Sequence, residues 1–369
     1  MIVIVGGGYA GAATAWALAR RGAGSRVTLL EAETTTGAHA SGRNAGLIGP
    51  MLEEDETLVE MAARGARLLQ GPIGPGGPPL IPCGSVRLVT EGPLMEAMLR
   101  RARDVGAAIE TLRTRELARD IPLLAGATAP VALCCPTDGK VDPAGLLAAY
   151  LAAAREAGVR VVTGARVVGL TTDGDRVTGV RTTTGTLPAD WVVNAAGAWA
   201  GQLAALAGIA DPGLASYRRH LFFSAALKAI DPGWPWVWDL PHDVYYRVDG
   251  DRLMLCACDV EPHPAAAAEV SPAMAARLAE KLAAAMPAVG AVALESARAC
   301  LRTFAPDRRY VIGPDPRLTG FFWVAGLGGT GATASAAAGE LAAGLLMGEN
   351  ASPALARAFD PARPALARP

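Results

Sequence analysis

The sequence predicts an α/β fold, with a nucleotide-binding domain built on a parallel sheet and a second domain of different composition. A glycine-rich turn, Gly6-x-Gly8-x-x-Gly11, joins a short apolar run to an alanine-rich stretch of helical character. A second glycine loop near the carboxyl end does the same. The 369 residues, of which 51% are hydrophobic, are enough for two domains and a large core.

The opening segment predicts one strand followed by one helix. Residues 2–5 are uninterrupted apolar residues, which suits a strand buried on both faces of a parallel sheet. Residues 10–21 have the spacing of an amphipathic helix, and Gly22 marks its end.

The turn between them predicts a dinucleotide site. Gly6 permits the tight turn, Gly8 lets the backbone approach a pyrophosphate, and Gly11 lets the helix pack closely on the strand. A second apolar strand at 27–30 ends in Glu31, whose carboxylate suits ribose hydroxyls and repels a 2′-phosphate. The pattern therefore disfavours NADP.

The middle of the chain leaves this domain and returns to it. Residues 71–80 form a loop rich in proline and glycine, and a strand is expected at 86–90. Asp142 then begins a helix that extends to about residue 157, followed by a strand at 159–163. We interpret the first part as a departure into the second domain and the later part as nucleotide-domain structure.

The next elements continue the nucleotide domain. Asp173-Gly174 and Thr184-Gly185 predict two hairpin turns. Residues 191–200 read as a buried strand followed by small residues, which let the backbone pass close to a bulky neighbour.

The final third of the chain predicts a second stretch in the other domain, followed by a return to the nucleotide-binding domain. Residues 217–304 contain aromatic strands and one helix, with Ser271 as N-cap, Pro272 at its first position and an end at Met286. A strand at 321–325 then leads into the second glycine loop and a long alanine-rich helix; the loop contains Gly326, Gly328, Gly329 and Gly331.

Composition excludes several classes of function. The net charge is −1 and no basic cluster is present, so we expect no nucleic-acid partner. The first strand begins at Ile2, which leaves no room for a signal peptide, and no apolar run approaches the length of a membrane span. The six cysteines form no CxxC pair and have no histidines at ligand spacing. We therefore expect a cytoplasmic protein with reduced thiols and no metal site.

Five motifs in this order give the chain a resemblance to a known family. It resembles the D-amino acid oxidase family of FAD-dependent amine oxidoreductases, in the branch with bacterial D-amino acid dehydrogenases and glycine and sarcosine oxidases. The motifs are the opening fingerprint with Glu31 and the segments 39–48, 138–143, 192–199 and 326–343. The resemblance implies FAD rather than NAD, in a Rossmann-like domain made of residues 1–50, 138–210 and 309–369. It also implies a mainly antiparallel substrate domain made of residues 51–137 and 211–308.

The resemblance implies the cofactor-binding residues. Arg43 would offset phosphate charge, and the terminal glycine loop would place N–H groups beside the flavin pyrimidine ring. The alternatives are an ordinary surface arginine and a helix start without a ligand. The implied set is Gly6, Gly8, Gly11, Glu31, Ser41, Arg43, Asn44, Ala45, Gly46, Val167, Ala196, Gly197, Gly328, Gly329, Thr330 and Gly331.

The resemblance also implies three catalytic residues. The substrate amine must be neutral for its α-hydrogen to leave as a hydride to flavin N5, and the substrate carboxylate must be held in place. Arg302 matches the family's carboxylate-binding arginine, Tyr245 a tyrosine that assists it, and Arg219 a further substrate-side arginine. The alternative for each is a purely structural contact.

Departures from the family pattern bear on the substrate. Where relatives that prefer cationic D-amino acids carry polar and acidic side chains, this chain has Leu47, Gly49, Leu52 and Ser85. A substrate cation would find no buried carboxylate there, although Glu53 or Glu54 could reach in. We therefore expect Leu47, Leu52 and Ser85 to bind a D-amino acid with an apolar or small side chain.

The expected activity is oxidation of an amino acid to the imino acid, which hydrolyses to the 2-oxo acid. Cys300 matches the cysteine that carries covalent flavin in sarcosine and pipecolate oxidases, so a secondary amine oxidase with flavin linked at Cys300 is one alternative. A flavin-binding subunit that is structural or transfers electrons within a heteromer is another. The sequence leaves open whether the electron acceptor is O2 or a quinone, and whether the chain forms a homo-oligomer or a heteromer.

Overall fold

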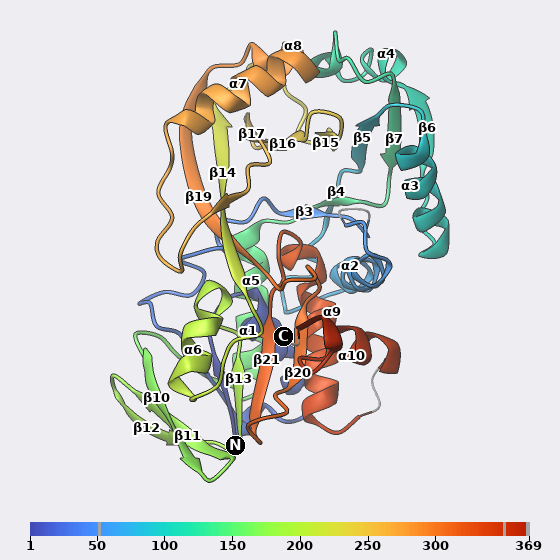
Figure 1. The fold of residues 1–369 in the computed structure, drawn as a ribbon. Helices are drawn as coiled ribbons and strands as arrows, with labels where there is room; N and C mark the ends of the chain where they lie inside the picture. Colours follow the sequence, from blue (N-terminus) through green and yellow to red (C-terminus); the bar gives the residue numbers. More distant parts are fainter. Residues whose placement is uncertain (51–52, 350–351, 367–369) are drawn as a thin grey trace.

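The computed structural model describes residues 1–50, 53–349 and 352–366. Two large sheets organise these residues: a six-stranded sheet that is mostly parallel and a nine-stranded sheet that is mostly antiparallel. In Figure 1 the first sheet and the amino terminus lie in the lower half of the molecule, and the second sheet lies in the upper half. The predicted α/β fold with a second, mainly antiparallel sheet is confirmed.

The six-stranded sheet contains the strands that the apolar runs predicted. Every pair in it is parallel except the edge pair β20 and β21. All four residues of β1 are buried, because helices cover one face and a smaller sheet with α6 covers the other. The strand order is β20 (Val311–Pro314), β21 (Phe321–Ala325), β13 (Trp191–Asn194), β1 (Ile2–Val5), β2 (Val27–Leu30) and β9 (Arg160–Val162).

Four helices pack together beside this sheet, and small residues set their spacing. They are α1 (Tyr9–Arg20), α2 (Glu56–Leu69), α5 (Pro143–Glu156) and α9 (Gly331–Leu346). A Cβ added at Gly339 in α9 would collide with the Ala13 carbonyl of α1, and one added at Gly65 in α2 would collide with the Thr333 carbonyl of α9. The predicted helix at 10–21 begins and ends one residue earlier, and Asp142 caps α5 as predicted.

The other face of the six-stranded sheet packs against an antiparallel meander and helix α6 (Ala200–Leu206). The meander consists of β10 (Val167–Asp173), β11 (Arg176–Thr182) and β12 (Gly185–Pro188). Its two connections fall at the predicted turns, since Asp173 pairs with Arg176 and Thr182 pairs with Gly185.

The nine-stranded sheet holds the aromatic strands of the later chain. Its longest pair is β14 (Ala215–Ser224) and β19 (Leu294–Phe304), which extends toward the six-stranded sheet (Figure 1). The other strands are β5 (Ser85–Val89), β6 (Glu110–Arg113), β7 (Val131–Cys135), β15 (Trp236–Asp239), β16 (Val244–Asp249), β17 (Arg252–Cys256) and β18 (Glu261–Pro262).

Helices α7 (Ala273–Ala285) and α8 (Pro287–Gly290) bury apolar side chains against one face of this sheet. The prediction of Ser271 as the N-cap of α7 was wrong: Pro272 occupies that position. Ser271 lies one residue before that cap, and its backbone N–H donates to Nε2 of the buried His220, 2.9 Å away. This long-range contact has no signal in the local sequence.

A small sheet and shorter helices complete the described chain. The sheet is β3 (Leu47–Ile48), β8 (Gly139–Lys140) and β4 (Ile81–Pro82), and it pairs segments from both sides of the predicted domain boundaries, which stay a prediction. The helices are α3 (Pro93–Asp104), α4 (Thr114–Leu117) and α10 (Pro353–Phe359). Within the described ranges, no helix is long and apolar enough to cross a membrane.

Candidate functional site

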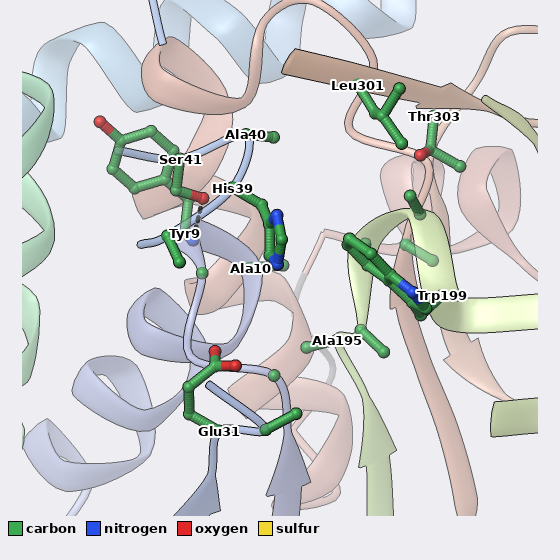
Figure 2. A pocket seen from close by; sticks show the side chains of 18 of the residues that line it. Tyr9, Ala10, Glu31, His39, Ala40, Ser41, Ala195, Trp199, Leu301 and Thr303 are labelled. Carbon is green, nitrogen blue, oxygen red and sulfur yellow. Dashed lines mark hydrogen bonds between the residues drawn. The ribbon is translucent and has the colours of Figure 1, made fainter. Parts of the chain in front are cut away.

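A large cavity lies at the carboxyl ends of β1, β2, β13 and β21, beside the start of α1. Figure 2 shows residues from four distant parts of the chain around it: Tyr9 and Ser41 on one side, Glu31 below, and Trp199 and Leu301 opposite. Carboxyl ends of parallel strands are the usual place for a ligand in such a sheet.

The opening glycine turn has the geometry that a bound pyrophosphate requires. Gly6 has a φ of 112°, and a Cβ there would collide with the Ala195 carbonyl. A Cβ at Gly8 would lie 2.9 Å from the Ser41 hydroxyl oxygen, so any side chain would fill this part of the cavity. A Cβ at Gly11 would collide with the Gly6 carbonyl, so Gly11 lets the helix approach the turn rather than lining the cavity.

Glu31 is fixed at the end of β2 with its carboxylate beside the cavity. Its Oε2 accepts a hydrogen bond from the Gly7 N–H and its Oε1 accepts one from the Glu33 N–H, both 2.9 Å long. A carboxylate has further lone pairs for the hydroxyls of a ribose. The position fits the predicted ribose contact.

Two aromatic side chains in the cavity were missed by the sequence reasoning. The rings of His39 and Trp199 line the cavity and contact one another, with their centroids 4.6 Å apart and their planes tilted by 47° (Figure 2). His39 also contacts Glu33, with 3.2 Å between Nε2 and Oε1. Both belong to motifs that carried the resemblance, which was the available signal.

Most of the predicted cofactor set lines the cavity. The lining members are Gly6, Gly8, Glu31, Ser41, Arg43, Asn44, Val167, Ala196, Gly197, Gly328 and Gly331. Gly11, Ala45, Gly46, Gly329 and Thr330 do not line it.

Arg43 and the turn around Asn44 bring a positive charge to the cavity. The Arg43 Nη1 donates to the Ala299 carbonyl of β19 at 3.1 Å, and no described carboxylate lies within ion-pair distance of Arg43. The Asn44 Oδ1 accepts from the Gly46 N–H at 2.8 Å. Gly46 has a φ of 70°, which favours glycine at this turn.

The terminal glycine loop, residues 326–331, lines another part of the cavity and contacts β19. The Gly328 N–H donates to the Thr303 carbonyl at 3.0 Å. A Cβ added at Gly329 would lie 3.4 Å from Nη1 of Arg302, so this guanidinium is adjacent to the loop. The Thr330 hydroxyl lies 3.1 Å from Glu53 Oε1 and donates to it. Burial raises the pKa of Glu53, against the opposing effects of Thr330 and two arginines.

Two of the three predicted catalytic residues, Arg219 and Arg302, meet beside this loop, and Tyr245 is close enough to interact electrostatically with both. The pairing of β14 with β19 places Arg219 opposite Cys300 and Tyr217 opposite Arg302, so the two arginines share one face of the sheet. The Arg219 Nε and the Arg302 Nη2 both donate to the Asp259 backbone carbonyl, each at 3.1 Å.

Electrostatics at this cluster are dominated by positive charge. Burial and the neighbouring Arg219 lower the pKa of Arg302 to about 10, so Arg302 remains protonated near neutral pH. Burial raises the pKa of the Tyr245 phenol, which is therefore a neutral hydrogen-bond donor. Burial opposes ionisation of Cys256, but a hydrogen bond from Cys258 and the charge of Arg219 outweigh it and lower the pKa of that thiol.

The predicted substrate-binding residues occupy a different region from the cavity. Leu47 packs in a cluster with Tyr245 and Cys256. Ser85 is buried, and its hydroxyl donates to the Asp138 carboxylate at 2.7 Å. Arg87 pairs with the same carboxylate, so Asp138 is a buried acid that is already neutralised. Leu52 lies outside the described residues.

Cys300 lines the cavity. Burial, partly opposed by Arg302, raises its pKa to about 11, so the thiol is protonated near neutral pH.

One described group of side chains has the spacing of a metal site: His220, Asp259 and Glu261. Each already has a partner. The His220 Nδ1 donates to Asp259 at 2.8 Å, and Glu261 pairs with Arg218 at 2.6 Å. Hydrogen bonding within the protein accounts for this cluster.

Comparisons with known proteins show what the chain is similar to. The family model described as "DAO: FAD dependent oxidoreductase" matches residues 1–345. The chain is 28% identical over 348 residues to 4-methylaminobutanoate oxidase (formaldehyde-forming) of Paenarthrobacter nicotinovorans, covering 89% of this chain and 41% of that protein. The chain thus spans about two fifths of the length of this relative.

Two solved structures are similar over nearly the whole chain. Glycine oxidase from Geobacillus kaustophilus superposes with a TM-score of 0.82 at 25% identity, covering 98% of both chains. L-proline dehydrogenase from P.horikoshii superposes with a TM-score of 0.84 at 22% identity, covering 98% of this chain and 96% of the other. The second likeness concerns the fold.

Proposed function

Because this chain belongs to the DAO family of FAD-dependent oxidoreductases, we propose that it oxidises a small amino acid to the imino acid, which water hydrolyses to the 2-oxo acid. The observation that carries the proposal is the meeting of Arg219 and Arg302 at the Asp259 carbonyl, beside the terminal glycine loop and with Tyr245 close to both. A D-amino acid with an apolar or small side chain is the proposed substrate class.

The described residues fit FAD. The start of α1 with Gly6 and Gly8 would hold the pyrophosphate, Glu31 the ribose, and the terminal glycine loop the flavin. When bound, FAD accepts the substrate hydride at flavin N5.

The protein's own part is to hold the substrate. Arg302 would bind the substrate carboxylate through its planar fork, and the neutral Tyr245 phenol would donate a hydrogen bond to it. Apolar neighbours, including Leu47 and Met254, exclude water on that side and strengthen these polar contacts. The result is a fixed orientation of the α-hydrogen.

The same cluster disfavours cationic substrates. Arg219, Arg298 and Arg302 have no ion-pair partner among the described residues, and Asp138 is neutralised by Arg87. A substrate ammonium or guanidinium side chain would meet like charges, and Glu53, the acid beside Arg302, accepts from Thr330 and has a raised pKa, which weakens it as a counter-ion.

A secondary amine oxidase with flavin attached at Cys300 is the second proposal, because Cys300 lines the cavity. Acid precipitation of the yellow protein separates the two proposals. Flavin that stays with the pellet, and is released by Cys300→Ser, supports the covalent form; flavin in the supernatant supports the noncovalent one.

Anaerobic reduction of the flavin tests the proposed activity. We expect the yellow holoprotein to bleach with members of a panel of D-, L- and N-methyl amino acids, and not with the cationic members. Admission of air then separates an oxidase, which reoxidises rapidly, from a dehydrogenase that uses a quinone or another acceptor. A protein that bleaches with no member of the panel supports the flavin-binding subunit of a heteromer instead. The cytoplasmic location and the assembly state stay predictions.

A further inference from the structure

Two arginines meet beside the terminal glycine loop, and one substrate carboxylate would neutralise only one of them. Arg219 and Arg302 each donate to the Asp259 backbone carbonyl at 3.1 Å, so the two donor nitrogens are at most twice that distance apart. Within the described ranges, no carboxylate oxygen lies within 4 Å of either guanidinium.

Both guanidiniums have donors left over. The terminal nitrogens of Arg219 make no hydrogen bond to any described residue, and neither does Nη1 of Arg302. The Nε of Arg302 is fully buried without a partner. The terminal nitrogens of Arg219 and Nη1 of Arg302 are not buried, so they are open to a ligand, and a bound anion would offset the mutual repulsion of the two adjacent cations.

Each nearby acid in the described chain already accepts a hydrogen bond within the protein, and none forms an ion pair with Arg219 or Arg302. The Asp259 carboxylate accepts from both the backbone N–H and the ring Nδ1 of His220. Glu53 accepts from Thr330, and Asp243 accepts from the Trp238 indole N–H. The Cys256 sulfur accepts from the Cys258 N–H at 3.3 Å and makes no hydrogen bond with Arg219. These groups moderate the positive charge at a distance but leave the free donors of both arginines unfilled.

The cofactor does not supply the missing anions. Neither Arg219 nor Arg302 lines the cavity that fits FAD, whereas Arg43 does. The phosphates of FAD therefore have their own cation, and the two arginines remain for the substrate.

We infer that the substrate carries two carboxylates, one bound by Arg302 and the other by Arg219. This inference rests on the proposed oxidation of a small amino acid and changes the expected side chain: in place of an apolar group, the substrate has a second carboxylate on the side chain or on the nitrogen. Acidic D-amino acids and N-carboxymethyl amino acids have this chemistry.

Ligand binding tests the inference without turnover. The flavin absorption of the holoprotein is titrated with malonate and, separately, with acetate. We expect malonate to bind at least about tenfold more tightly, since a hydrogen-bonded charge pair contributes at least one factor of ten. In Arg219→Gln this preference should disappear while acetate affinity stays within about threefold. Equal affinity of the wild type for both anions would overturn the inference, whatever the variants do.

Arg218→Gln is the matched control. Arg218 immediately precedes Arg219 on β14, so its side chain points to the opposite face of the sheet, where it pairs with Glu261. Its loss should therefore leave the malonate preference unchanged. If Arg219→Gln weakens malonate and acetate equally, both arginines hold a single carboxylate and the inference fails. If Arg219→Gln does not fold with FAD, Arg219→Lys replaces it: it keeps the charge, loses the fork, and should retain only part of the preference.

A substrate pair separates this inference from the proposed function. Anaerobic bleaching by iminodiacetate is compared with bleaching by sarcosine, which differs in lacking one carboxylate. Faster bleaching by iminodiacetate, by about tenfold or more in kcat/KM, supports both proposals. Bleaching by sarcosine with no gain from the second carboxylate supports the function and overturns the inference. A malonate preference without bleaching by any amine supports the two-anion site and overturns the function.

Discussion

Among the residues that the structure describes, Arg302 is a partly buried cation with neither an acidic partner within 4 Å nor a full set of hydrogen bonds. An arginine retained for structure normally binds a carboxylate, as Arg87 binds Asp138 in the same sheet. The contrast between these two arginines supports the proposal that Arg302 binds a ligand.

Arg302→Ala and Arg302→Lys should therefore damage catalysis and spare the fold. We expect kcat/KM to fall by about two orders of magnitude or more, because the bidentate, charge-assisted contact with the substrate carboxylate is lost. Flavin content and melting temperature should change little, since the one hydrogen bond of Arg302 to the described part of the chain goes to the Asp259 backbone carbonyl. Steady-state kinetics and thermal melts of the holoprotein measure both effects.

The opposite pattern would assign Arg302 a structural role. A lower melting temperature or lost FAD, with near-normal kcat/KM in the protein that still folds, would remove Arg302 from the substrate site. Arg219 would then be the remaining candidate for the carboxylate.

At the scale of elements, the connection from β1 to α1 requires glycine at position 6 for two reasons. The backbone there has a positive φ, and it passes close to the residue that follows β13. Gly6→Ala combines a φ of 112° with a collision against the Ala195 carbonyl. We expect a loss of about 2–4 kcal/mol in the free energy of unfolding, from backbone strain and overpacking together. Urea denaturation of the two proteins measures it.

Gly22→Ala is the matched control for that substitution. Gly22 also has a positive φ, 75°, but a Cβ there would meet nothing within 4 Å. It should cost only about 1 kcal/mol, the strain alone. Equal losses in the two variants would show that the approach to Ala195 is not a constraint.

The connection between β20 and β21 depends on a buried carboxylate. Asp315 accepts from the Trp323 indole at 2.9 Å and from the Arg317 guanidinium at 2.7 Å. Burial opposes ionisation of Asp315, but the hydrogen bonds from Arg317 and Trp323 outweigh it, so its pKa lies below the usual value. Asp315→Asn should cost about 1.5–3 kcal/mol at pH 7.

The sign of the pH dependence follows from that lowered pKa. Between the pKa of Asp315 in the folded protein and its higher pKa in the unfolded chain, the folded protein binds fewer protons. The stabilisation by Asp315 is therefore present above the pKa of the unfolded chain and is lost as the pH falls through the pKa of the folded protein. The difference in unfolding free energy between wild type and Asp315→Asn should therefore shrink from pH 7 to pH 3. A difference that stays constant over this range would contradict the assignment.

At the scale of the whole molecule, the cavity connects the two large sheets. Its lining includes Gly6 and Glu31 at the ends of strands in the six-stranded sheet, and Cys300 and Thr303 from β19 of the nine-stranded sheet. A ligand that fills it contacts both sheets and favours the folded state over the unfolded chain.

FAD removal should therefore lower the stability of the entire described fold. Adding FAD back at about 100 times its dissociation constant should raise the free energy of unfolding by about 2.7 kcal/mol. Melting temperature as a function of FAD concentration measures this linkage. A melting temperature independent of FAD would contradict the placement of the cofactor between the sheets.

The sequence by itself determined the features that depend on local chemistry. The glycine turn, the strands β1 and β2, the Asp142 cap of α5 and the hairpin turns of the meander follow from backbone freedom, apolar runs and capping side chains, all of which act over a few residues. The resemblance carried by the motifs identified the family and FAD.

Only the tertiary structure decided which side chains meet. Arg219 and Arg302 are 83 positions apart, and their adjacency depends on the register of β14 with β19 and on the shared Asp259 carbonyl. The sequence likewise gave no sign that Ser271 would bind His220. Local pattern records the conformation that a residue prefers, whereas a partner across the sheet is chosen by packing and strand register of the folded chain as a whole.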